Sequence, residues 1–187
     1  MKFDRITEDG RLWAARYDGM QDNILYHTFH NWLDMEWLEQ FFSEHAMDLW
    51  RYFRIVNIDD AIFDTLSDAV RMQSLILDIS PDADLDAIFK PLHNSRTAEM
   101  LLGKEKAKGF RTSGHPSWLR LYAIKLESQA YVITGGAIKL TYTMNERQHT
   151  LTELIRMEAV RNFLIENGVS DLDGIIDFTE EHDGKSN

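Results

Sequence analysis

A chain of 187 residues, 44 % of them apolar, is long enough to build one hydrophobic core, and its 10 Phe, 6 Tyr and 5 Trp argue against disorder. The absence of cysteine excludes disulfides, thiol nucleophiles and cysteine-based metal sites. A net charge of −11 argues against a general nucleic-acid binder. Because no signal peptide and no apolar run of roughly 18 residues is present, we expect a cytoplasmic protein that does not enter membranes.

The first half predicts a β-hairpin followed by helices. Asp9-Gly10 is a strong hairpin turn between two short strands over 2–17. Apolar residues then recur at helical spacing, with Asp34 as the predicted start of a second helix. The predicted helices cover 23–53, 57–79 (capped by Asn57 or Asp59) and 85–89.

The second half predicts a basic loop, a β-hairpin and a long helix. Glycines and prolines make 93–117 mostly loop, and 118–126 and 129–141 form the strongest strand pair in the sequence. Gly135-Gly136 interrupts the second strand and indicates a bulge or bend. The pattern Thr150-Leu-Thr-Glu153 is typical of a capping box that opens a helix, which ends at Asn167-Gly168. An edge strand is expected at Ile175–Phe178.

Together these elements predict an α+β fold. A twisted antiparallel sheet, made of the N-terminal hairpin and the central hairpin, packs against several helices. We expect one domain over 1–178, with an acidic helical part at 1–89 and a part at 90–178 that holds the basic loop, the hairpin and the last helix. Residues 179–187 are expected to form a disordered tail.

Nucleotide-binding and hydrolase motifs are absent: there is no Walker loop, dinucleotide fingerprint, HExxH or GxSxG. His27 and His30 lie three residues apart on a predicted helix, but beyond Asp34 no third ligand accompanies them, so we expect neither a metal site nor another cofactor.

Positive charge is concentrated in one segment of this acidic chain. Residues 90–125 carry eight basic and two acidic residues. Because adjacent antiparallel strands bring the start of one beside the end of the next, Arg120 and Lys139 should approach each other, with Arg147 and His149 on the connection that follows. Three cations and a histidine suit electrostatic stabilisation and proton transfer at a phosphate. The alternative is that these residues pair with the abundant carboxylates.

The motifs KPL, KAKG, WLRLYAIKL and YVITGGAIKLT, followed by a polar link and a helix, resemble the RelE/ParE toxin superfamily over residues 85–165, and most of all its HigB-like, phage-derived branch. The resemblance implies a bacterial toxin of a toxin–antitoxin pair that cleaves messenger RNA without a metal. It implies that Arg120 and Lys139 contact the scissile phosphate, while Arg147 and His149 supply the late basic and proton-transfer groups. The side chains implied to hold the RNA backbone are those of Lys104, Lys106, Lys108, Arg111 and Lys125.

The partners implied are RNA or the ribosome and an antitoxin protein, and a homodimer is a further candidate. The alternative function, from another class, is a non-enzymatic interaction or regulatory module that uses the same fold and offers its basic face to a protein partner.

Overall fold

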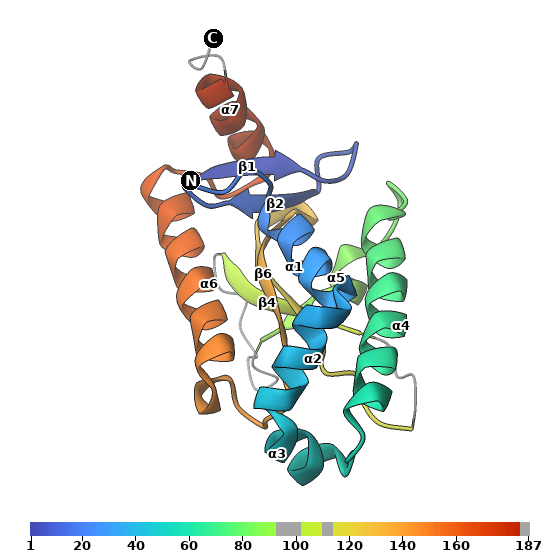
Figure 1. Cartoon of the computed structure of the whole chain (residues 1–187). Coiled ribbons are helices and arrows are strands. Elements are labelled where there is room, and N and C mark those ends of the chain that lie inside the picture. Colours follow the sequence, from blue (N-terminus) through green and yellow to red (C-terminus); the bar gives the residue numbers. More distant parts are fainter. Residues whose placement is uncertain (93–101, 110–113, 184–187) are drawn as a thin grey trace.

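The computed structural model describes residues 1–92, 102–109 and 114–183. In the described residues a six-stranded sheet lies between α6 on one face and α1, α2 and α4 on the other, while α7 extends beyond β1 (Figure 1). The strands are β1 (Lys2–Arg5), β2 (Leu12–Arg16), β3 (Lys90–Pro91), β4 (Gly103–Lys108), β5 (Leu119–Lys125) and β6 (Tyr131–Ile138). The α-helices are α1 (Ile24–Leu33), α2 (Met35–Glu44), α3 (Ala46–Asp48), α4 (Ile58–Leu77), α5 (Leu85–Ile88), α6 (Gln148–Glu166) and α7 (Leu172–Asp183), and a π-helical turn covers Leu49–Phe53.

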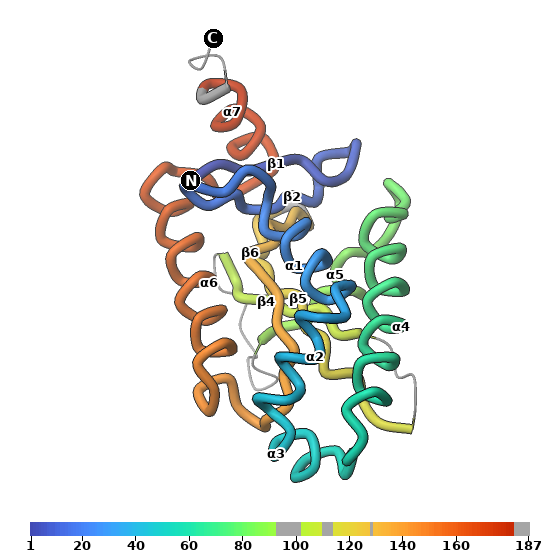
Figure 2. The backbone as a smooth tube through the Cα atoms, in the orientation of Figure 1, coloured from blue at the N-terminus to red at the C-terminus, as the bar shows by residue number. Residues whose placement is uncertain are grey.

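The strand order β1-β2-β6-β5-β4-β3 confirms the α+β class and joins the N-terminal hairpin to the central one. Four of the five strand pairs are antiparallel, as expected. The fifth, between β2 and β6, is parallel, so the expectation of a wholly antiparallel sheet is wrong at this pair. The connection between β2 and β6 is long and contains helices α1 to α5 and strands β3 to β5, as Figure 2 traces. Such a connection allows β6 to run parallel to β2, which a short turn does not.

Local capping follows the sequence through the first half. The side chains of Asn23, Asp34 and Asn57 accept hydrogen bonds from backbone N–H groups at the starts of α1, α2 and α4. The apolar stripes of these helices then bury large rings, such as Trp32 and Phe42, against β5 and β6. The predicted start of a second helix at Asp34 is therefore confirmed.

Three local predictions are wrong. Residues 103–108 form strand β4 and not a loop, because lysines alternate with Gly103, Glu105 and Ala107 and the segment pairs with β5 on one side and β3 on the other. Residues Ile175–Phe178, which were expected to form an edge strand, are helical and belong to α7. The same helix includes residues 179–183, which were expected to belong to a disordered tail.

The start of the last long helix also differs from the prediction. The capping box is formed by Thr143 and Glu146 in a 3-10 turn, and α6 already begins at Gln148. Thr150 lies inside the helix, where its hydroxyl donates to the Met144 and Arg147 carbonyls. Glu153 is consequently not a cap but a buried side chain that faces the sheet.

The two glycines in β6 allow helices to approach both faces of the strand. A Cβ atom at Gly135 would overlap the carboxylate of Glu153 on α6, and a Cβ atom at Gly136 would lie 2.6 Å from Cγ2 of Thr28 and 3.0 Å from Cζ2 of Trp32 on α1. The register of β5 and β6 shifts at Thr134, immediately before the pair, which confirms the predicted bulge.

The Gly136→Ala substitution is expected to destabilise the fold by about 1–3 kcal/mol, because the added methyl overpacks the contact between β6 and α1. The measurement is urea unfolding followed by circular dichroism. The Thr28→Ser substitution removes Cγ2 but keeps the hydroxyl that donates to the Ile24 carbonyl. Combining the two should therefore recover part of the loss, and strictly additive effects would contradict this account of the glycine.

Candidate functional site

Five of the predicted cations share the face of the sheet that α6 covers. Side chains alternate between the two faces of a strand, so Lys104, Lys106 and Lys108 project from β4 to the same side. Lys108 lies opposite Arg120 on β5, and Arg120 in turn lies opposite Ala137 on β6. Lys139 follows β6 two residues after Ala137 and belongs to the same face.

Four of these side chains, Lys106, Lys108, Arg120 and Lys139, form what we call the cationic cluster. Burial lowers the pKa of the Lys106 and Lys139 amines, and the positive charge of Arg120 lowers both further. Burial also lowers the pKa of the Arg120 guanidinium. Arg120 lies opposite Ala137, two residues before Lys139, so the two cations lie on one face at the same end of the β5–β6 hairpin, as predicted.

Within the described residues, the cationic cluster forms no ion pair with a carboxylate. Lys106 Nζ donates to the Leu92 carbonyl at 2.6 Å. Lys139 Nζ donates to the carbonyls of Thr141 and Tyr142 at 2.5 and 2.6 Å. Arg120 uses only Nη1, which donates to the carbonyls of residues 117 and 119, and no acceptor among the described residues takes its Nε or Nη2. The guanidinium therefore keeps donors available for an anion.

The other predicted RNA-binding cations differ. Lys104 pairs with Glu158 on α6. Lys125 projects from the opposite face of β5 and pairs with Asp86 at 3.0 Å, so it lies away from the cationic cluster. Arg111 lies outside the described residues. Lys104 and Lys125 therefore follow the alternative given by the sequence, in which basic residues pair with carboxylates of the same chain.

The predicted late basic group is likewise paired. The guanidinium of Arg147 donates from Nε and Nη2 to the two oxygens of Asp48, at 2.6 and 2.5 Å. Asp48 is buried, and this bidentate contact raises the pKa of Arg147. Arg147 thus joins α6 to the helical segment at 46–53 and is not open to a phosphate.

His149, the predicted proton-transfer group, is held by the strand. Its Nε2 donates to the Ile138 carbonyl at 2.9 Å, and its ring packs edge-on against Phe41 and His45. Burial lowers the pKa of this imidazole despite the opposing effect of the hydrogen bond. Neutral His149 therefore fixes α6 against the end of β6.

Glu153 is the functional candidate that sequence reasoning missed. Its Oε1 accepts from Arg156 at 2.6 Å, whereas Oε2 is buried and has no hydrogen-bond partner among the described residues. Burial raises the pKa of Glu153 to about 7, against the opposing effect of Arg156. Burial dominates because the Glu153 side chain is only 4 % exposed, while that of Arg156 is 39 % exposed and its charge is screened by water. The signal in the sequence was an acidic residue at a position where the helix faces the sheet.

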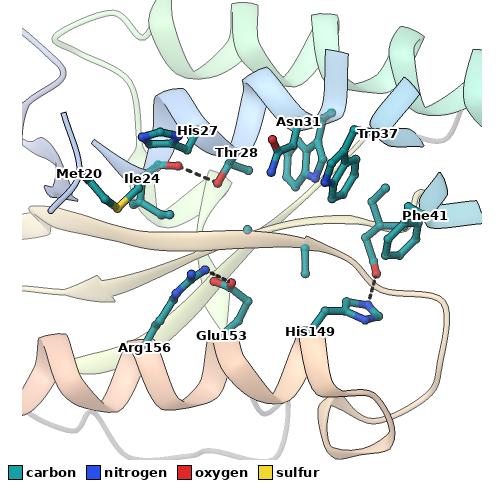
Figure 3. A pocket seen from close by; sticks show the side chains of 14 residues that line it. Met20, Ile24, His27, Thr28, Asn31, Trp37, Phe41, His149, Glu153 and Arg156 are labelled. Atoms are coloured by element: carbon teal, nitrogen blue, oxygen red, sulfur yellow. Dashed lines mark hydrogen bonds and ion pairs between the residues drawn. The ribbon is translucent and has the colours of Figure 1, made fainter. Parts of the chain in front are cut away.

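A pocket of about 350 Å³ opens beside β6, between α1 and α2 on one side and α6 on the other (Figure 3). Its walls combine aromatic rings with polar groups. The residues drawn there include His27 and Asn31 from α1, Trp37 and Phe41 from α2, and His149, Glu153 and Arg156 from α6. Such a mixture of apolar surface and a few polar groups is typical of small-molecule sites.

Within the described parts of the chain, no group of three or more His, Asp or Glu side chains is arranged to hold a metal ion, and no helix is long and apolar enough to cross a membrane. Searches of protein-family models, of curated proteins and of solved structures give no match to this chain.

The raised pKa of Glu153 predicts that the free energy of unfolding depends on pH, and that the Glu153→Gln substitution removes this part of the pH dependence. Its pKa rises from 4.5 to about 7 on folding, so its contribution to stability is full below about pH 4.5 and is lost as the pH rises through 7. Relative to the Glu153→Gln variant, the native chain should lose up to about 3 kcal/mol between about pH 5 and about pH 8. Urea unfolding at both pH values measures this difference.

The matched control for this prediction is Glu166→Gln, at the exposed end of the same helix. It should leave the pH dependence of the native chain unchanged. Parallel pH profiles of the native chain and the Glu153→Gln variant would contradict the raised pKa.

Proposed function

We propose that this chain is an RNA-directed cytoplasmic protein of the RelE/HigB toxin type, and that it holds RNA phosphates on the cationic cluster. One observation carries the proposal: in a chain of net charge −11, four cations gather on one face without a carboxylate partner among the described residues. By contrast, the other three predicted cations in the described residues, Lys104, Lys125 and Arg147, each form an ion pair, with Glu158, Asp86 and Asp48 respectively.

The electrostatics of the cationic cluster favour a phosphate over a carboxylate side chain. Among the described residues, the Lys106 and Lys139 amines donate only to neutral carbonyls, and burial followed by repulsion from the neighbouring cations lowers the pKa of both. A phosphate in their midst would relieve that repulsion. It would also accept charge-assisted hydrogen bonds from Nε and Nη2 of Arg120.

Exposed aromatic side chains beside Lys139 support a single-stranded ligand. Tyr142, whose carbonyl accepts from Lys139, is 82 % exposed, and its ring meets that of Tyr52 edge-on at 4.9 Å. Trp50 in the same helical turn is 48 % exposed and carries the Arg54 guanidinium over its ring. Aromatic rings next to cations give unpaired bases a surface for stacking.

In RNA cleavage the cationic cluster would stabilise the charge that develops on the phosphate when the neighbouring 2′-hydroxyl attacks. Arg120 and Lys139 would fill that role. Arg147 and His149 instead bond to Asp48 and to the strand, which argues against the proton-transfer roles that the resemblance implies. This observation favours a second candidate function, in which the same face binds RNA, or an antitoxin protein that covers it, without cleavage.

Expression in bacteria tests the proposal. The native chain should arrest growth, and Lys139→Gln and Arg120→Gln should each abolish the arrest, because each removes a phosphate contact. Lys125→Gln is the matched control: it makes the same change on β5, but on the opposite face, and should keep the arrest. Circular dichroism of the purified variants checks that each is folded.

Primer extension on cellular messages separates the two candidate functions. New RNA 5′ ends that vanish in Lys139→Gln support cleavage, and arrest without new ends supports binding alone. Harmless expression of the native chain, or equal loss of arrest in Lys125→Gln, would contradict a toxin that acts through the cationic cluster.

A further inference from the structure

The pocket lies beside the part of β6 that extends past the end of its pairing with β2. β2 pairs with β6 only as far as Ala14 opposite Ile133, so no strand in the described part of the chain pairs with 134–138 on that side. Two side chains take up part of this open edge. The Tyr17 hydroxyl donates to the Thr134 carbonyl at 2.6 Å, and His149 donates to the carbonyl of residue 138.

Gly136 lies between these two capped positions, and its own backbone groups are available. The backbone of Lys139 bonds to Trp118 on β5, and successive residues of a strand point their N–H and C=O groups to alternate sides. The N–H and C=O of Gly136 therefore point away from β5, towards the pocket that Gly136 lines. No described residue bonds to either group, and Gly136 is part exposed while Gly135 is buried.

Two buried polar atoms without a hydrogen-bond partner among the described residues lie around the same space. His27 Nε2 and Glu153 Oε2 are both buried and make no hydrogen bond to a described residue. Asn31 lines the same pocket from α1 and lies between Thr28 and Trp37 in Figure 3. Buried polar groups are normally paired, so these atoms indicate a missing ligand or bound water.

The far wall of the pocket is aromatic. Phe41 from α2 is stacked between Trp37, at 5.4 Å with ring planes 15° apart, and His45, so the half-buried Trp37 supplies the ring face of this wall, and Trp32 also lines the pocket. This wall offers a surface to another ring, while the opposite side offers donors and acceptors.

We propose that this pocket binds a small, planar heteroaromatic ring of the nucleobase class. The ring packs against Trp37, and its edge exchanges hydrogen bonds with the backbone of Gly136 and with the Asn31 amide. A ligand with a donor and an acceptor on one edge satisfies both groups of Gly136, which a purely apolar ligand would leave unpaired.

The same chemistry has two sources, a free nucleoside or a base in an RNA strand. The inference goes beyond the proposed function, because the pocket is built from other residues than the cationic cluster. Loss of binding in the pocket and loss of phosphate binding can therefore be measured separately.

Isothermal titration with the four ribonucleosides, and with ribose 5-phosphate as a ligand that lacks a base, tests the proposal. At least one nucleoside should bind at millimolar concentration or below, while ribose 5-phosphate should not bind. Asn31→Leu should weaken nucleoside binding by about tenfold, through loss of the amide hydrogen bonds. Asn162→Leu, the same change on the exposed side of α6, should leave the affinity within about twofold.

A short single-stranded RNA and its abasic counterpart identify the source. Binding of free nucleosides assigns the pocket to small molecules. Binding of the RNA alone, lost both in the abasic strand and in Asn31→Leu, assigns it to a base of the strand. The proposal is overturned if neither nucleosides nor RNA respond to Asn31→Leu, or if ribose 5-phosphate binds as well as the nucleosides.

Discussion

The close approach of two helices to a single strand, β6, determines the rest of this structure. Gly135 makes room for Glu153 of α6, and Gly136 makes room for Thr28 and Trp32 of α1. Any larger residue would push one helix away from the sheet. The approach of α6 buries Glu153 and brings His149 to the end of β6, and both side chains line the pocket together with Gly136. The pocket therefore depends on the same two positions.

Charge pairing distinguishes the cationic cluster from the other cations of this acidic chain. Ion pairs with Glu158, Asp86 and Asp48 occupy three of the predicted cations. These pairs join elements to one another: β4 to α6, β5 to α5, and the start of α6 to α3. The cationic cluster lies between them without such a partner among the described residues. Its positive charge remains available to an external anion, which favours phosphate binding over a structural role.

The elements were more predictable than their contacts. Side-chain caps and apolar stripes identified α1, α2 and α4, and strand propensity identified β5 and β6. The pattern Thr-x-x-Glu occurs at both 143–146 and 150–153, and only tertiary contacts decide that the first caps while the second places Glu153 against Gly135. Similarly, the approach of Arg120 and Lys139 follows from the hairpin alone. The parallel return of β6 to β2 and the pocket beside it depend on segments far apart in the sequence.

If the cationic cluster holds RNA phosphates, RNA binding must weaken as the salt concentration rises, and the cations of the cluster must contribute to that dependence. The most direct measurement is the salt dependence of binding to a fluorescent single-stranded RNA, compared between the native chain, Lys139→Gln and Lys125→Gln. Each lost phosphate contact should reduce the slope of log K against log salt by about 0.7. The account predicts that reduction for Lys139→Gln and an unchanged slope for Lys125→Gln. Equal slopes for all three proteins, or no RNA binding at low salt, would contradict it.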